Sequence, residues 1–332
     1  MKPRNFHVRV ALGTVAFIVS LLWPGATSAN SLTTSVIGLF PRQMSDFAYA
    51  DMKTGRKSPW FTQVQEQLVP DKLRQFQQFL TSAGMDLNSQ VDELCWGTVD
   101  LTDGHGQQFI GVALGQFDVT TITDMLTQKN LPVIEVHGFD LYAFGNGSGP
   151  SDIFFTFIDS NTAAFGQRAA LDKLIDARTG AAESLLSNDK MFSLITEANG
   201  GGLIWAVLDH GYARMAMEKM FPQAAQFRQS DSIINQMKGI AINVDAGDDV
   251  NVELQAICNS TEDANIFGAA MQASLLYRRY QASQGSEANS VLTAALDQAR
   301  VTPSGDRLRV DFSVTQDQIL SLLLSHNLVP QQ

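Results

Sequence analysis

The chain has 332 residues, with 23 lysines and arginines against 34 aspartates and glutamates, and a formal net charge of −11. This acidic balance, without any lysine–arginine cluster, argues against nucleic acid as a partner, because clustered basic side chains bind the phosphate backbone. Hydrophobic residues make up 45% of the chain, which excludes a disordered protein, and the length suggests about two domains.

The first residues are typical of a secretory signal peptide. A basic start at Lys2, Arg4 and Arg9 precedes an apolar stretch over residues 10–23, and small residues follow. We predict a signal peptide over residues 1–29, no membrane span after its cleavage, and a periplasmic or extracellular location. The alternative is an uncleaved N-terminal anchor, although the apolar stretch is short for a membrane-spanning helix of about 20 residues.

The rest of the chain reads as an internal repeat. Residues 47–51 and 205–209 are short apolar runs that both end in aspartate. After each run come a helical pattern broken by proline, a β-hairpin with a Gly- and Asp-containing turn, and another helix. The predicted fold class is α+β, with two tandem similar lobes, each an antiparallel sheet with helices packed on one face.

A polar stretch of small residues around 181–188 marks the predicted boundary between the lobes. The first lobe then covers residues 30–185 and the second covers residues 186–332. The run 153–158 is almost wholly apolar, which predicts a strand covered on both faces. An exposed apolar patch on that strand is the alternative.

The two cysteines, Cys95 and Cys258, lie far apart in the sequence. Export to an oxidising compartment permits a disulfide between them. Unpaired cysteine commonly packs as a small hydrophobic residue, and we expect two buried thiols.

No motif indicates a metal ion, a cofactor or an activated nucleophile. The glycine-rich stretches 145–149 and 200–202 precede predicted strands, whereas a phosphate-binding loop leads from a strand into a helix. No histidine pair has the spacing of a metal site on a helix. We therefore predict no cofactor and no metal.

Asp51 and Asp209 hold equivalent positions in the two halves, and His210 follows the second aspartate. Two such carboxyl groups could form an acid–base pair across a pseudo-twofold axis, so these three residues are the candidate catalytic residues. An aspartate between a strand and a helix is more typical of an N-cap, which is the role we expect.

A cluster of aromatic and basic residues, Tyr277, Arg278, Arg279 and Tyr280, lies late in a predicted helix. It is a candidate contact for a partner. The alternative is a favourable interaction between the two arginines and the C-terminal end of the helix dipole.

The export signal, the duplicated α+β pattern and the Pro59–Trp60 start of the first helix together resemble a group of exported bacterial proteins of unknown function. The resemblance covers most of the chain after the signal peptide. It implies the fold and the location and brings no functional residues.

These observations predict a non-catalytic exported cell-envelope protein that binds a ligand or an envelope protein, most naturally in a cleft between the two lobes. One alternative is an envelope hydrolase whose active site is assembled in space. Another is a structural or assembly subunit.

Overall fold

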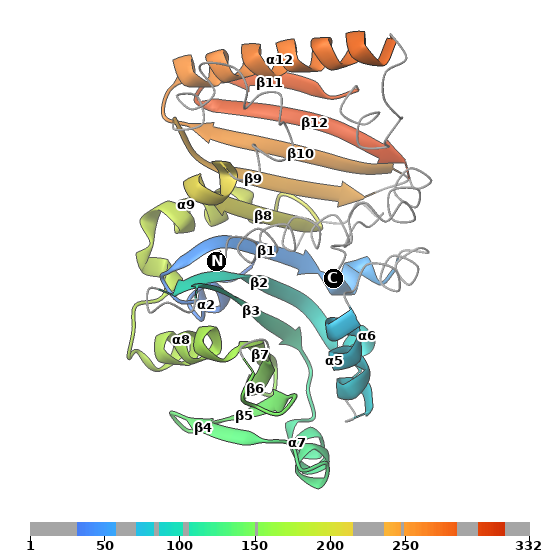
Figure 1. Ribbon diagram of the computed structural model, residues 1–332, viewed down its shortest axis with the longest axis vertical. Helices are drawn as coiled ribbons and strands as arrows, with labels where there is room; N and C mark the ends of the chain where they lie inside the picture. The colour runs from blue at the N-terminus through green and yellow to red at the C-terminus, as the bar shows by residue number, and fades with distance from the viewer. Residues whose placement is uncertain are drawn as a thin grey trace, which may run out of the picture.

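The computed structural model describes residues 32–57, 71–82, 86–101, 106–149, 152–214, 236–246, 249–283 and 298–315. Within them the chain forms one twelve-stranded antiparallel sheet with helices on both faces (Figure 1). The predicted signal peptide and parts of the proline-broken helical patterns, around residues 60–68 and 224–235, lie outside the described residues.

The described strands in chain order are β1 (Met44–Asp51), β2 (Val91–Leu101), β3 (Gly106–Gly115), β4 (Val133–Val136), β5 (Phe139–Phe144), β6 (Ile153–Asp159), β7 (Thr162–Gln167), β8 (Ile204–Asp209), β9 (Met237–Ala246), β10 (Asp249–Cys258), β11 (Arg300–Ser304) and β12 (Arg307–Thr315). Across the sheet they run β11-β12-β10-β9-β8-β1-β2-β3-β7-β6-β5-β4.

The described α-helices are α2 (Thr34–Ile37), α3 (Met52–Gly55), α5 (Asp71–Ser82), α6 (Leu87–Gln90), α7 (Val119–Gln128), α8 (Arg168–Thr179), α9 (Asp189–Ala198) and α12 (Thr261–Ser283). A short 3-10 turn, Leu185–Ser187, lies where the boundary between the lobes was predicted. Figure 1 shows α12 at one end of the molecule and β4 with α7 at the other.

The pair β1–β8 joins the two halves of the chain. Ala48 of β1 lies opposite Ala206 of β8, and Asp46 lies opposite Leu208. The mixed α+β class and the antiparallel pairing are as predicted. The prediction of a separate sheet in each half is wrong, because β1 pairs with β2 along one edge and with β8 along the other.

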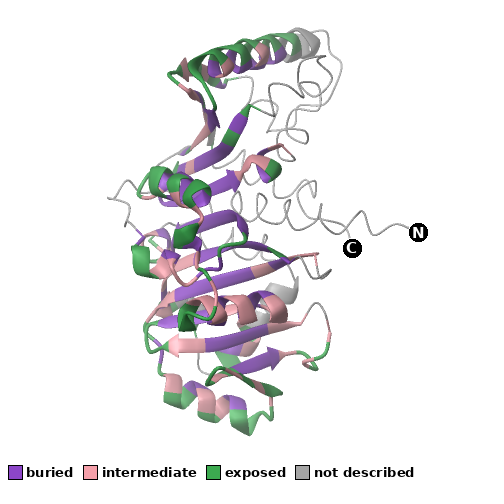
Figure 2. Ribbon diagram, turned by 90° about the vertical axis from the view of Figure 1, so that its left-hand side faces the viewer, coloured by how far each residue is buried: buried purple, intermediate pink, exposed green. Residues whose placement is uncertain are grey.

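Helices cover both faces of the sheet, because successive side chains of a strand point to opposite sides. Phe47 and Tyr49 pack in one core with α8 and α9. Ala48 and Ala50 face the opposite core, which α12 covers, and α7 packs on that same side. The prediction that helices lie on one face only is therefore wrong. Figure 2 shows the buried strands running between these layers.

Stacked aromatic rings fill the core beside the β1–β8 pair. Trp205 has no exposed surface and stacks on Phe47, at 5.6 Å between ring centroids, and on Tyr49, at 5.5 Å. Phe40 adds an edge-to-face contact with Phe47 at 4.9 Å. Because Trp205 comes from β8 and both of its partners come from β1, this stack ties the two halves together.

Local signals in the sequence set several helix ends. Asp118 accepts a hydrogen bond from the Thr121 amide at 3.1 Å and so caps α7. Asn188 caps α9 through the Met191 amide. Gly180 ends α8 with a φ of 79°, in the left-handed region that glycine adopts without strain.

Strand β6 is covered on both faces, as its apolar sequence predicts. Phe154 belongs to the core beneath α8 and α9, and its neighbour Phe155 belongs to the core on the opposite face. Both are buried. This strand therefore offers no exposed apolar patch to an assembly partner.

Cys95 and Cys258 are both free and buried, which confirms the prediction of two thiols. Cys95 lies in the core beneath α8 and α9, whereas Cys258 lies in the core beneath α12. Because the sheet separates them, no disulfide can join them without breaking the fold.

The aromatic stack predicts a large effect of substitution at Trp205. We expect Trp205→Ala to lower the free energy of unfolding by about 3–5 kcal/mol, because it removes a fully buried aromatic side chain from between two rings. Denaturant unfolding followed by circular dichroism measures the change. The control is Val133→Ala, at a side chain that is 47% exposed, which should change stability by less than about 0.5 kcal/mol. Equal losses in the two variants would contradict a central role for the stack.

Candidate functional site

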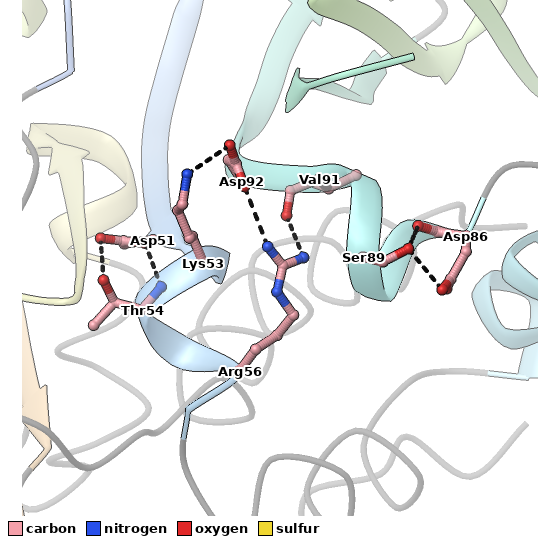
Figure 3. A network of polar contacts seen from close by, with 8 residues as sticks. All are labelled: Asp51, Lys53, Thr54, Arg56, Asp86, Ser89, Val91 and Asp92. Carbon is pink, nitrogen blue, oxygen red and sulfur yellow. Dashed lines mark hydrogen bonds and ion pairs between the residues drawn. The ribbon is translucent and has the colours of Figure 1, made fainter. Parts of the chain in front are cut away.

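Asp51 lies at the junction of β1 and α3 and is 3% exposed. Its carboxylate accepts hydrogen bonds from the Thr54 amide and the Thr54 hydroxyl, each at 2.8 Å (Figure 3). These are the N-cap hydrogen bonds that the sequence led us to expect. Both carboxylate oxygens are engaged within the same turn, which gives the side chain a structural role.

A network of polar contacts holds α3 against the start of β2. The Arg56 guanidinium donates to the Val91 carbonyl at 2.7 Å and to Asp92 at 3.2 Å, and the Lys53 ammonium donates to the same carboxylate at 3.2 Å (Figure 3). Lys53 is largely exposed, so its ion pair adds at most about 1 kcal/mol. The network positions the residues around Asp51 without leaving an unpaired cation there.

Glu93 was not identified from the sequence. It lies directly opposite Asp51 in the β1–β2 pair, so two carboxyl groups face each other across the strands. Burial raises the pKa of Glu93, and the negative charge of Asp51 raises it further. The Tyr49 hydroxyl partly offsets these effects. Only the pairing register of β1 with β2 brings these two residues together, since they are 42 positions apart in the sequence.

Asp209 has the corresponding capping role at the end of β8. Its carboxylate accepts a hydrogen bond from the Tyr212 amide at 3.0 Å. Burial raises the pKa of Asp209, while the amides of Tyr212 and Gly211 lower it, and the charge of Asp100 raises it. The neighbouring His210 has its Nδ1 atom 2.8 Å from the Met237 carbonyl oxygen, so one ring nitrogen is occupied by the backbone.

The two candidate carboxylates lie at opposite ends of the β1–β8 pair. Asp51 donates its amide to the Leu203 carbonyl at 3.0 Å, just before β8 begins, whereas Asp209 follows Leu208, which lies opposite Asp46. Five residues of extended strand separate these ends by roughly 17 Å. Since an acid–base dyad needs carboxyl groups in contact, Asp51 and Asp209 do not form one.

A second buried polar cluster was also missed at the sequence level. Asp46 has no exposed surface, and it accepts hydrogen bonds from the Thr98 amide at 2.8 Å and from the Thr98 hydroxyl. The Thr98 hydroxyl in turn lies 2.8 Å from the Tyr212 hydroxyl. The cluster connects β1 and β2 to the segment after β8, which again joins the two halves. The signal in the sequence was an aspartate at an inward position of an otherwise apolar strand.

The two halves meet directly within the described residues. Backbone hydrogen bonds connect β1 directly to β8, and the Trp205 rings fill the core beside them. The described part of the chain also holds no group of three histidine, cysteine or acidic residues that could bind a metal ion. Among the residues the structure describes, no helix has the length and apolar character needed to cross a membrane.

The outer face of α12 is the most exposed apolar surface among the described residues. Five large hydrophobic side chains of the described residues are exposed. Three of them, Ile266, Leu276 and Tyr277, lie on α12. Tyr277 belongs to the predicted partner contact and is 52% exposed. The other three residues of that contact, Arg278, Arg279 and Tyr280, continue the helix, but their side chains lie outside the described residues.

Comparison with known proteins adds little. No protein-family model matches the chain, and no curated protein matches it. Crystal form I of TP0453 is similar over 87% of this chain and 96% of that chain, with 10% sequence identity and a TM-score of 0.45. Crystal form IV of TP0453 is similar over 89% and 97%, with 8% identity and a TM-score of 0.46. A likeness at this level says nothing about function.

The facing carboxyl groups predict a stabilising substitution, Glu93→Gln. The raised pKa means that the folded state holds the Glu93 proton more tightly than the unfolded state. Stability is therefore lost as pH rises from the ordinary value of 4.5 through the raised pKa. The glutamine side chain does not titrate and so avoids that loss. We expect the free energy of unfolding to rise by up to about 1 kcal/mol at pH 7. Denaturant unfolding between pH 4 and pH 7 measures it.

The matched control is Asp92→Asn at the neighbouring position. Its carboxylate accepts from Arg56 and Lys53, so this variant should gain no stability at pH 7. An unchanged pH profile in Glu93→Gln, or a loss of stability at pH 7, would contradict the assignment.

The capping geometry predicts how Asp51 responds to substitution. Asp51→Ala should lower the free energy of unfolding by about 0.5–2 kcal/mol, because the Thr54 amide loses its acceptor. Asp51→Asn keeps a side-chain oxygen and should cost less than half as much. Thermal unfolding of the two variants compares them. If asparagine were as destabilising as alanine, the negative charge, and not the cap, would be what the fold requires.

Proposed function

We propose that this chain is an exported, non-catalytic cell-envelope protein that binds a protein partner through the outer face of α12. The single observation that carries the proposal is the group of exposed apolar side chains on this helix. Figure 1 shows the helix at one end of the molecule. Exposed apolar side chains that gather on one face are characteristic of protein–protein contact sites.

Cleavage after residue 29 is compatible with the contacts of Leu32. Leu32, three positions after the proposed cleavage site, is 3% exposed and exchanges two hydrogen bonds with the Asn199 side chain, at 2.8 and 2.9 Å. Removal of residues 1–29 would therefore leave this anchored residue in place. We propose a periplasmic or extracellular location for the cleaved chain; retention of an uncleaved anchor is the alternative.

The absence of catalysis is supported by the positions of the candidate residues. Asp51 and Asp209 each cap a local helix, and roughly 17 Å of strand separates them. His210 contacts the backbone. None of the three supplies the paired groups that the hydrolase alternative would need.

We further propose that the two halves arose by duplication. From the central β1–β8 pair outward, each half runs through a hairpin, β2–β3 or β9–β10, and then a strand that returns beside it, β7 or β12. Aligning Asp51 with Asp209 makes Ala48 equivalent to Ala206, and these two residues lie directly opposite each other. A pseudo-twofold axis would pass through that pair, which supports the duplication.

A photo-crosslinking amino acid at Leu276 tests the partner surface in the native envelope. We expect crosslinked adducts of discrete mass from this position and none from Ala181, an exposed residue after α8. Mass spectrometry of the same material reports whether the chain begins after residue 29. A lack of adducts at Leu276, or equal adducts at both positions, would contradict the proposed binding surface.

A further inference from the structure

We infer that the occupant of the α12 surface is a second copy of this chain, with the two α12 helices packed antiparallel. The inference rests on the proposed function and names its partner. It starts from the fact that α12 carries two apolar faces, of which the fold uses only one.

The inner face of α12 packs on the sheet. Phe267, Met271 and Leu275 are buried in the core that includes residues of β10 and β12. Gly268 allows a close approach, since a Cβ atom there would lie 3.1 Å from Leu308 Cδ1. Gln272 donates to the Val301 carbonyl of β11 at 3.2 Å. One side of the helix is thereby fixed against the protein.

The outer face repeats with the spacing of a helix-pairing seam. Ile266, Ala269, Ala273 and Leu276 follow one another at intervals of three, four and three residues, and all four are exposed. This is the a/d spacing by which two helices pack their side chains together. At 100° per residue the stripe lies almost opposite the buried face, so it points away from the sheet.

The stripe is symmetric about Met271. In chain order its side chains are large, small, small and large. Ile266 and Leu276 lie equally far from Met271 in the sequence, and so do Ala269 and Ala273. Antiparallel pairing of two copies about a twofold axis therefore sets each alanine against an alanine and each isoleucine against a leucine. Small residues at the centre let the helix axes approach closely, and the larger residues close the ends. A twofold contact requires such self-complementarity.

Charge along the helix favours the same arrangement. The first turn carries Glu262 and Asp263, and the last turn of the described helix carries no basic residue. Antiparallel pairing about residue 271 places the two acidic first turns at opposite ends of the contact, and it also opposes the two helix dipoles. Parallel pairing would bring like charges together. The whole chain has a net charge of −11, which becomes −14 without Lys2, Arg4 and Arg9 of residues 1–29, so keeping these acids apart matters for two copies to associate.

A membrane surface fits the same stripe less well. Helices that lie on membranes carry lysine and arginine along their polar face, whereas α12 has two acids, Glu262 and Asp263, in its first turn, and its two arginines follow the stripe in the sequence. A contact of one helix from each copy is also smaller than the roughly 1,600 Å² of a standard interface, so we expect a dissociation constant in the micromolar range.

A charge-swap series tests the inference on the mature chain, residues 30–332. Sedimentation velocity up to about 100 µM, well above a micromolar dissociation constant, should show a monomer–dimer equilibrium. Ala269→Glu alone and Ala273→Lys alone should each weaken dimerisation at least about tenfold, since each buries an unpaired charge at the contact. The double variant should restore it, because antiparallel pairing sets residue 269 of one copy against residue 273 of the other.

Controls separate a lost contact from a lost fold. Glutamate and lysine are good helix formers, so thermal unfolding should be unchanged in each variant. Ala181→Glu, the same substitution at another exposed alanine, should leave dimerisation unchanged.

Three outcomes would overturn the inference. The first is a wild-type chain that stays monomeric at every concentration, and the second is a dimer insensitive to Ala269→Glu. The third is a double variant that remains monomeric, as parallel pairing would produce. A monomer that co-sediments with phosphatidylethanolamine–phosphatidylglycerol vesicles through the stripe would identify a membrane as the occupant instead. Crosslinking from Leu276 to a different envelope protein would overturn the second copy while leaving the proposed function intact.

Discussion

The pairing of β1 with β8 is the interaction on which the rest of the structure depends. It joins strands from the two halves of the chain by backbone hydrogen bonds, and Trp205 reinforces it by stacking on Phe47 and Tyr49. A single antiparallel sheet of twelve strands follows, since each half adds its remaining strands outward from this pair. The helices then divide between the two faces of the sheet. Successive side chains of the central strands point to opposite faces, and both faces are apolar.

Ionisable groups near this central pair serve the structure. Asp51 and Asp209 cap the turns that leave β1 and β8, and Asp46 is held by Thr98 in the interior. These carboxylates are buried or half-buried, and each accepts hydrogen bonds, as buried charges require. Glu93 is placed less favourably, because burial raises its pKa and the charge of Asp51 raises it further. The fold accepts that cost at the edge of the β1–β2 pair.

The most exposed apolar surface of the described residues lies away from the central β1–β8 pair. The strands between the two ends are covered by helices or lined with polar side chains, whereas α12 presents an apolar stripe on the side that faces away from the sheet. A helix that is apolar on two opposite sides needs two partners, and the sheet supplies only one. That second side is the surface through which we propose that the protein binds a partner.

The sequence by itself determined the local elements. The strand at 153–158 and the cap at Asp51 depend on neighbouring residues, so they could be read directly. The α+β class followed from them. Only the tertiary structure decided that the halves share one sheet, because strand pairing between residues 48 and 206 leaves no mark on the pattern around either. The same long-range register brought Glu93 opposite Asp51 and placed Asp51 and Asp209 far apart. It also left the outer face of α12 uncovered, since which side of a helix is buried depends on the sheet that it meets.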